Sequence, residues 1–174
     1  MFRITSISFC IILLFFISDL YSQELPEHKE QKHKISVMFG YTHIPKGIKN
    51  ETKGVFAPTL GFEYEYEFNH KWAAGLVGDI EFLNYSVDFD DELVPRENVI
   101  VIAALAFYKL TDHFQVYLGP GYEIEQNKQH FVVRSGLKYI IELNEKFDLA
   151  PLVEFDFKEE YETVTAGFTV GMKL

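Results

Sequence analysis

Acidic side chains recur at alternate positions in several segments of this chain, and closely spaced carboxylates of this kind could perform general acid–base catalysis. The carboxylates in this pattern are Glu63, Glu65, Glu67, Asp79, Glu81, Glu123, Glu125, Glu154 and Asp156. The bases that follow the same alternation are Arg134 and Lys138, together with Lys109 and Lys158. Paired charges are the usual filling of a narrow barrel, where each needs a partner to offset the cost of leaving water. We therefore interpret the set as a charge network in the lumen of a barrel and assign no catalytic residue.

Three further groups could suggest chemistry, and the spacing of each argues against it. His130 and Ser135 could form a hydrolase pair, but residues five apart on one strand point to opposite faces. The acidic segment 88–92 lacks the glycine and the spaced ligands of a calcium loop, so we expect a solvated acidic loop. The histidines near the N-terminus follow no metal-binding spacing. The sequence thus predicts no cofactor and no metal.

Residues 1–22 have the layout of a secretory signal peptide. Arg3 gives a short positive region, an apolar run follows at 7–17, and polar residues begin at Ser18. The apolar run is too short to cross a bilayer as a helix. Residues 23–33 are polar and charged, which predicts a disordered periplasmic lead-in. Cys10 is the only cysteine and lies in the signal peptide, so the mature chain has neither a disulfide nor a thiolate metal site.

Residues 34–174 indicate one all-β domain of long antiparallel strands. Eight alternating segments have roughly the length of tilted transmembrane strands, which need about 9–11 residues in the apolar zone. These segments are Lys34–Ile44, Val55–Phe68, Trp72–Tyr85, Asn98–Leu110, Phe114–Gln126, His130–Leu143, Phe147–Lys158 and Thr163–Leu174. A similar turn joins three pairs of them: Phe68-Asn69-His70-Lys71-Trp72, Leu110-Thr111-Asp112-His113-Phe114 and Leu143-Asn144-Glu145-Lys146-Phe147. Tight turns at one end and more varied connections at the other predict an eight-stranded up-and-down transmembrane β-barrel.

Two stretches interrupt the regular alternation. Residues 86–97 are expected to form a loop between the third and fourth strands. Pro58, Pro120 and Pro151 fall within strands, where proline removes a donor from the hydrogen-bond ladder. We therefore expect bulges or register shifts at the three prolines.

The residue types on the two faces of the strands indicate which face lines the lumen and which face is on the outside. Aromatic and aliphatic residues share one face, and charged residues share the other. The glycines on the charged face are Gly40, Gly61, Gly75, Gly119, Gly121, Gly136, Gly167 and Gly171. A narrow lumen needs small residues there, whereas a face exposed to water gains nothing from them. We therefore expect the apolar face to meet lipid and the charged face to line the lumen.

These residues resemble the small outer-membrane β-barrel domain proteins of Gram-negative bacteria, a broad group that includes OmpX- and OmpA-like barrels. The resemblance covers residues 34–174. It rests on Gly40-Tyr41-Thr42-His43, on Gly61-Phe62-Glu63-Tyr64-Glu65-Tyr66, on Leu118-Gly119-Pro120-Gly121 and on the closing segment 167–174. It implies insertion by the barrel-assembly machinery, which reads alternating apolar residues at the C-terminus; Leu174 stands where phenylalanine is usual. The fold hosts adhesins, structural proteins and lipid-modifying enzymes, so the resemblance implies no single activity.

We expect an outer-membrane protein of structural or interaction type, surrounded by lipid and without catalysis. The formal net charge of −10 argues against nucleic acid as a partner. An alternative is a soluble periplasmic or secreted barrel of lipocalin type, whose aromatics would line a cavity for an apolar ligand. A weaker alternative is a lipid-modifying outer-membrane enzyme. The pattern leaves the identity of any extracellular ligand open.

Overall fold

The structure is a computed structural model that describes residues 31–44, 54–89, 92–124, 129–159 and 161–174. The expected signal peptide, most of the expected lead-in, and Glu125 lie outside these residues. Strand β1 begins at His33, at the end of the segment expected to be a lead-in. The described residues contain no helix that is long and apolar enough to cross a membrane.

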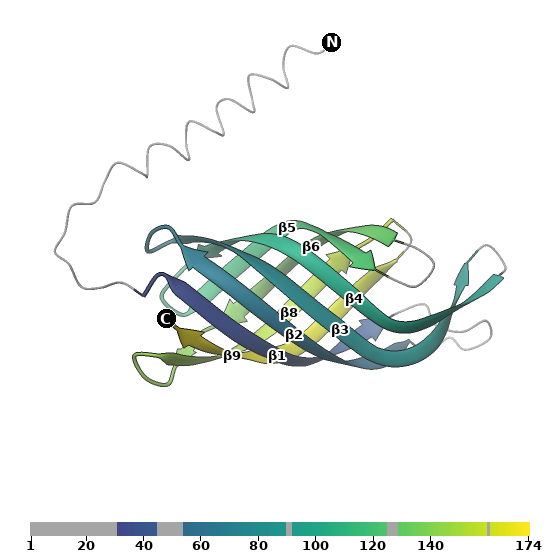
Figure 1. Ribbon diagram of the computed structural model, residues 1–174, viewed down its shortest axis with the longest axis horizontal. Coiled ribbons are helices and arrows are strands. Elements are labelled where there is room, and N and C mark those ends of the chain that lie inside the picture. The colour runs from purple at the N-terminus through teal and green to yellow at the C-terminus, as the bar shows by residue number, and fades with distance from the viewer. Residues whose placement is uncertain (1–30, 45–53, 90–91, 125–128, 160) are drawn as a thin grey trace, which may run out of the picture. The chain divides into compact units, whose positions relative to one another are not determined.

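Antiparallel strands form a single sheet that closes on itself (Figure 1). The strands are β1 (His33–Ile44), β2 (Val55–Glu67), β3 (Trp72–Phe89), β4 (Glu92–Lys109), β5 (Phe114–Ile124), β6 (Gln129–Tyr139), β7 (Ile141–Glu142), β8 (Phe147–Phe157) and β9 (Glu162–Lys173). Strands β1 to β6 pair in chain order, β6 and β7 both pair with β8, and β8 pairs with β9. The sheet closes where β9 pairs with β1, from Lys34–Lys173 to His43–Val164. The short β7 continues β6 beyond Ile140, because both pair with β8 in one unbroken register. The predicted eight-stranded antiparallel barrel is therefore confirmed.

The three similar turns have the same hydrogen bonds. In each, the N–H of the first residue donates to the carbonyl oxygen of the closing aromatic over 2.8–2.9 Å; the pairs are Phe68–Trp72, Leu110–Phe114 and Leu143–Phe147. In each, a side-chain oxygen of the second residue accepts hydrogen bonds from two later backbone N–H groups; these residues are Asn69, Thr111 and Asn144. Short polar side chains are suited to this role because they reach the backbone two residues on. We call the end of the barrel that carries these turns the turn end.

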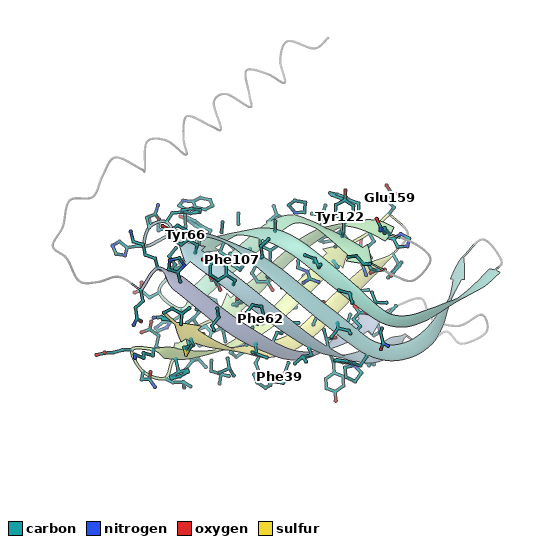
Figure 2. All side chains as sticks on the ribbon, viewed as in Figure 1. Phe39, Phe62, Tyr66, Phe107, Tyr122 and Glu159 are labelled. Atoms are coloured by element: carbon teal, nitrogen blue, oxygen red, sulfur yellow. The ribbon has the colours of Figure 1, made fainter. Side chains whose placement is uncertain are left out.

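The apolar residues face outward and the charged residues face inward. Phe62 and Leu76 are 54% and 59% exposed, whereas Glu65 and Arg134 are 1% and 0% exposed. Figure 2 shows Phe39 and Tyr122 standing on the outside of the barrel, whereas Phe107, also labelled there, is buried in the interior. A water-soluble β-sandwich would bury its apolar face instead. The arrangement of faces also contradicts the lipocalin-type alternative, in which the aromatics would line the interior.

Two apolar clusters share the interior with the charges. One lies at the end opposite the turns and consists of Ile44, Ala57, Val99, Val101, Val132 and Tyr161. The other lies along β3, β4 and β5 and consists of Ala73, Val77, Ala103, Leu105, Phe107 and Tyr117. The buried side chains Val101 and Ala103 account for the apolar inner face of β4, which the alternation rule alone does not predict.

The expectation of a loop at 86–97 was wrong. Strands β3 and β4 continue through most of this stretch and pair from Asn84–Glu97 to Phe89–Glu92. Asp88, Phe89 and Glu92 of the acidic segment therefore belong to the strands of a long hairpin, and residues 90–91 lie outside the described part. The pairing of β2 with β3 ends at Thr59–Glu81, and that of β5 with β4 ends at Ile100–Ile124. Beyond these pairs the hairpin extends past the rest of the sheet (Figure 1).

The expectation of register shifts at the three prolines was also wrong. The register runs unchanged past Pro58, Pro120 and Pro151. Proline instead interrupts two ladders. The β4–β5 pairing lapses at Gly119 and Pro120, between Ala103–Gly121 and Ala106–Leu118. The β6–β8 pairing lapses opposite Pro151, which separates β6 from β7. The register shift that the structure does contain lies between Glu81 and Asn84, at the base of the hairpin. Asn98, opposite this bulge, adopts a positive φ of 50°, a conformation that asparagine tolerates better than most residues.

Candidate functional site: the charged interior

Arg134 on β6 is the centre of the first group of charges. Its guanidinium donates to Asp79 on β3, with an Nη1–Oδ1 distance of 2.5 Å. It also donates to Asp156 on β8, with Nε–Oδ1 and Nη2–Oδ2 distances of 2.7 Å. Glu154 lies 3.2 Å from Nε and accepts a 3.0 Å hydrogen bond from the Tyr117 hydroxyl. The planar guanidinium can serve several carboxylates at once, and it thereby connects three strands across the lumen.

Two lysines form the second group, nearer the turn end. Lys138 pairs with Glu63 and lies 3.5 Å from Glu65 Oε1. Its ammonium also stands over the rings of Phe107 and Tyr117, at 4.9 and 5.3 Å from the centroids, a position in which a cation is attracted to the ring faces.

The second lysine of this group approaches from β1. Lys34 Nζ lies 3.0 Å from Glu65 Oε1 and 3.7 Å from Asp148 Oδ2. Gln115 Nε2 donates to the other oxygen of Glu65 over 3.1 Å. Glu65 is therefore shared by two lysines and an amide, while Asp148 has only the longer contact to Lys34 among the ion pairs of the described residues.

A third group lies toward the end opposite the turns. Lys158 pairs with Glu123, and its ammonium lies 4.6 Å from the Tyr161 ring centroid. The Tyr161 hydroxyl donates to Glu123 Oε1 over 3.0 Å. Glu81 is buried nearby, and its Oε2 makes no hydrogen bond to the described residues. Three threonines beside it, one each on β1, β2 and β9, link their hydroxyls over 2.7 and 2.8 Å: Thr42, Thr59 and Thr165.

Most residues expected to form a charge network meet in these groups. Those that form ion pairs in the interior are Glu63, Glu65, Asp79, Glu123, Arg134, Lys138, Glu154 and Asp156. Glu67 lies at the rim instead, where it pairs with Lys109 over 2.7 Å. Glu81 faces the lumen without a hydrogen bond to its Oε2, and Glu125 lies outside the described residues.

Sequence reasoning placed Gln115 and Asp148 on the charged face but did not include them in the network, and it missed Lys34, Tyr117 and Tyr161 altogether. Asp148 and Gln115 carried a usable signal, since each alternates with outward-facing aromatic or aliphatic neighbours. Tyr117 stands in phase with Gln115 and Glu123 on β5, so the two-residue period also indicated an inward position for it. Tyr161 carried no such signal, because it precedes the segment expected to form the last strand. Lys34 begins the expected first strand in phase with Gly40, which was placed on the charged face, so its inward position could also have been predicted.

The geometry restricts the chemistry available to the interior. Among the described residues, no cluster of histidine, cysteine, aspartate and glutamate has the geometry to hold a metal ion. His130 and Ser135 lie in register with Glu123 and Leu118, which occupy opposite faces of β5, so they form no pair. Carboxylates outnumber cations in the described interior: Glu63, Glu65, Asp79, Glu81, Glu123, Asp148, Glu154 and Asp156 against Lys34, Lys138, Arg134 and Lys158. Each of these cations forms an ion pair with at least one carboxylate, so removal of any one cation would leave a buried carboxylate without its partner.

Several solved structures share the fold at low sequence identity. Neisserial surface protein A matches with a TM-score of 0.54 and 11% identity, over 82% of this chain and 97% of that one. OprG from Pseudomonas aeruginosa matches with a TM-score of 0.53 and 16% identity, over 83% and 99%. Ail, the attachment invasion locus protein of Yersinia pestis, matches with a TM-score of 0.50 and 16% identity, over 80% and 96%. Searches against family models and curated proteins found no match to the sequence.

The closed sheet and the inverted faces define the class: this chain is a small eight-stranded β-barrel of the outer-membrane type. The expected resemblance to small outer-membrane barrels is confirmed at the level of the fold, since the matching structures belong to that class. The predicted location in the outer membrane agrees with these structural neighbours and with the apolar outer surface. Hydrocarbon is the environment in which a closed barrel with outward phenylalanines and leucines is stable.

Proposed function

We propose that this protein is a structural or interaction-type barrel of the outer membrane, without catalysis and without a conducting pore. The observation that carries the proposal is the filled interior. Arg134, Lys138 and Lys158 tie carboxylates together across the lumen, and the apolar cluster around Tyr161 occupies the end opposite the turns. The interior of an eight-stranded barrel is just wide enough for side chains to fill it, and buried side chains fill this one, so functional surface is to be sought on the outside.

The hairpin of β3 and β4 supports a role in interaction. Its outer part, 84–97, pairs only within itself, because β2 and β5 end their pairing before it. Backbone groups at the free edges of such a ribbon can pair with an extended segment of another chain. The sequence of this segment is acidic from Asp88 to Glu92, which would favour a basic partner. The partner itself is not specified by these features.

Three experiments test the proposal. Purified, folded protein in a planar bilayer should give no stable ion conductance, and incubation with outer-membrane lipids should leave the lipids chemically unchanged. A variant with residues 86–95 replaced by a two-residue turn should still fold, since no other strand pairs with them. Stable conductance would contradict the closed lumen, and lipid turnover would establish the enzymatic alternative. Loss of folding in the shortened variant would show that the hairpin serves the barrel rather than a partner.

A further inference from the structure

The turn end carries lysines of two kinds. Lys109 and Lys173 are held by carboxylates at the rim: Lys109 Nζ lies 2.7 Å from Glu67 Oε1, and Lys173 Nζ lies 2.7 Å from Glu142 Oε1. Lys71 and Lys146 are exposed and have no carboxylate partner among the described residues. The two kinds are adjacent in space, because Lys109 N donates to Lys71 O and Lys173 N donates to Lys146 O, each over 2.8 Å.

The two exposed lysines occupy the same place in their turns. Each directly precedes the closing aromatic, Trp72 or Phe147. The Asn69 and Asn144 side chains accept hydrogen bonds from the backbone N–H groups of the lysine and the aromatic alike, over 2.9–3.0 Å. The position of each lysine backbone is therefore fixed relative to an aromatic on the lipid-facing surface.

This placement sets the depth of the lysines relative to a bilayer. Aromatic side chains of membrane proteins concentrate at the level of the headgroups. The Trp72 ring packs on Tyr108 with centroids 4.7 Å apart, and Phe147 is exposed on the outer face. A lysine one residue further out can extend its aliphatic stem along this belt and place its ammonium among the lipid phosphates. An unpaired ammonium at that height is complementary to the negatively charged phosphates of the headgroups.

We infer that Lys71 and Lys146 bind the phosphates of anionic phospholipids in the leaflet at the turn end. The inference rests on the proposed membrane location and adds a lipid preference to it. The third turn does not take part, because it carries Asp112 and because His113 Nδ1 already lies 3.2 Å from the Ile140 carbonyl oxygen. Glu145 precedes Lys146 in the chain, but the two form no ion pair. The whole chain has a net charge of −10 and would be repelled by an anionic surface. Attraction to anionic lipid therefore requires that these two cations lie next to the headgroups.

The test compares two double variants that remove the same charge. Lys71→Gln with Lys146→Gln removes the exposed lysines, and Lys109→Gln with Lys173→Gln removes their paired neighbours. For each protein, the free energy of unfolding by urea is measured in vesicles of phosphatidylcholine and in vesicles that also contain phosphatidylglycerol. The difference between the two lipids cancels any general loss of stability.

The wild type should be more stable with phosphatidylglycerol, by roughly fivefold in the folding equilibrium for each exposed lysine, the usual effect of a lysine near an anionic surface. The exposed-lysine variant should lose this lipid dependence, and the paired-lysine variant should keep it. Added salt should weaken the effect through screening. The inference would be overturned if the exposed-lysine variant kept the lipid dependence of the wild type, or if both variants lost that dependence equally. Neither result would contradict the proposed barrel. Failure of the wild type to fold in either lipid would overturn the proposed function as well.

Discussion

The guanidinium of Arg134 on β6 meets the carboxylate of Asp79 on β3 across the lumen, with 2.5 Å between Nη1 and Oδ1. The two residues are 55 positions apart in the chain and belong to strands that do not pair. The contact therefore joins opposite walls of the barrel through side chains alone. Because Asp156 and Glu154 use the same guanidinium, the interior depends on one cation to balance three carboxylates.

Replacement of Arg134 by methionine should be strongly destabilising. Methionine keeps much of the side-chain volume but leaves Asp79, Glu154 and Asp156 without their cation. The loss of one partner from a buried ion pair costs about 3–5 kcal/mol, because the remaining charge is uncompensated. Urea titration of the refolded protein in lipid or detergent measures this cost. Lys109→Met is the matched control: its rim ion pair is partly exposed and such pairs contribute about 0–1 kcal/mol. Similar costs for both variants would show that the interior network contributes no more than the rim.

Substitutions on the two faces of β3 should lower the free energy of unfolding by different amounts. Leu76 faces outward and is 59% exposed, whereas Glu81 faces the lumen. Leu76→Arg places a charge in hydrocarbon, which costs about 2–4 kcal/mol near the bilayer midplane. Glu81→Gln should cost less, because Glu81 Oε2 accepts no hydrogen bond from the described residues. Equilibrium refolding into lipid vesicles gives both values, and a reversed order would refute the assignment of faces.

Gly136 should tolerate no side chain while Tyr117 is present. A β-carbon at position 136 would lie 2.2 Å from Tyr117 Cζ and 2.3 Å from its hydroxyl oxygen. Gly136→Ala should therefore displace the ring and its hydrogen bond to Glu154, at a cost of about 1–3 kcal/mol for an overpacked interior. In a Tyr117→Ala background the same substitution should cost much less, which a double-mutant cycle would detect. Additive costs would show that the two residues do not compete for space.

Deletion of Val170–Leu174 should abolish assembly. These residues supply the part of β9 that pairs with β1 at the turn end, from Val37–Val170 to Lys34–Lys173. An open barrel leaves unpaired backbone groups in hydrocarbon, and each such group costs several kcal/mol. Migration on a gel with and without boiling reports the folded barrel. A truncated chain that still gave the folded band in membranes would mean that β9 does not close the barrel.

The alternation of residue types was sufficient to predict the strands, the faces and the turns. Phe62 and Leu76 were placed outside and Glu65 inside by the two-residue period alone. The same rule could not predict the partners of each charge. Arg134 meets Asp79 because the strands are tilted and staggered around the barrel, and this stagger determines which inward residues share a height. Alternation identifies the face of a residue but does not determine its height in the lumen.

Two other features escaped prediction for local reasons. The acidic composition of 88–92 suggested a loop, yet β3 and β4 remain paired up to Phe89–Glu92. An isolated hairpin can hold such residues because neither edge has to pair with a further strand. Pro151 was expected to shift the register, but it interrupts the β6–β8 ladder and leaves the register unchanged on either side. The missing N–H removes a hydrogen bond without requiring an extra residue.

The most direct test of the account is the fractionation of cells that express the full chain. The outward phenylalanines and leucines of the closed barrel predict that the mature protein pellets with outer membranes and requires detergent for extraction. The extracted protein should then migrate differently before and after boiling, as a folded barrel does. Recovery of the protein from the periplasm as a soluble monomer would contradict the account.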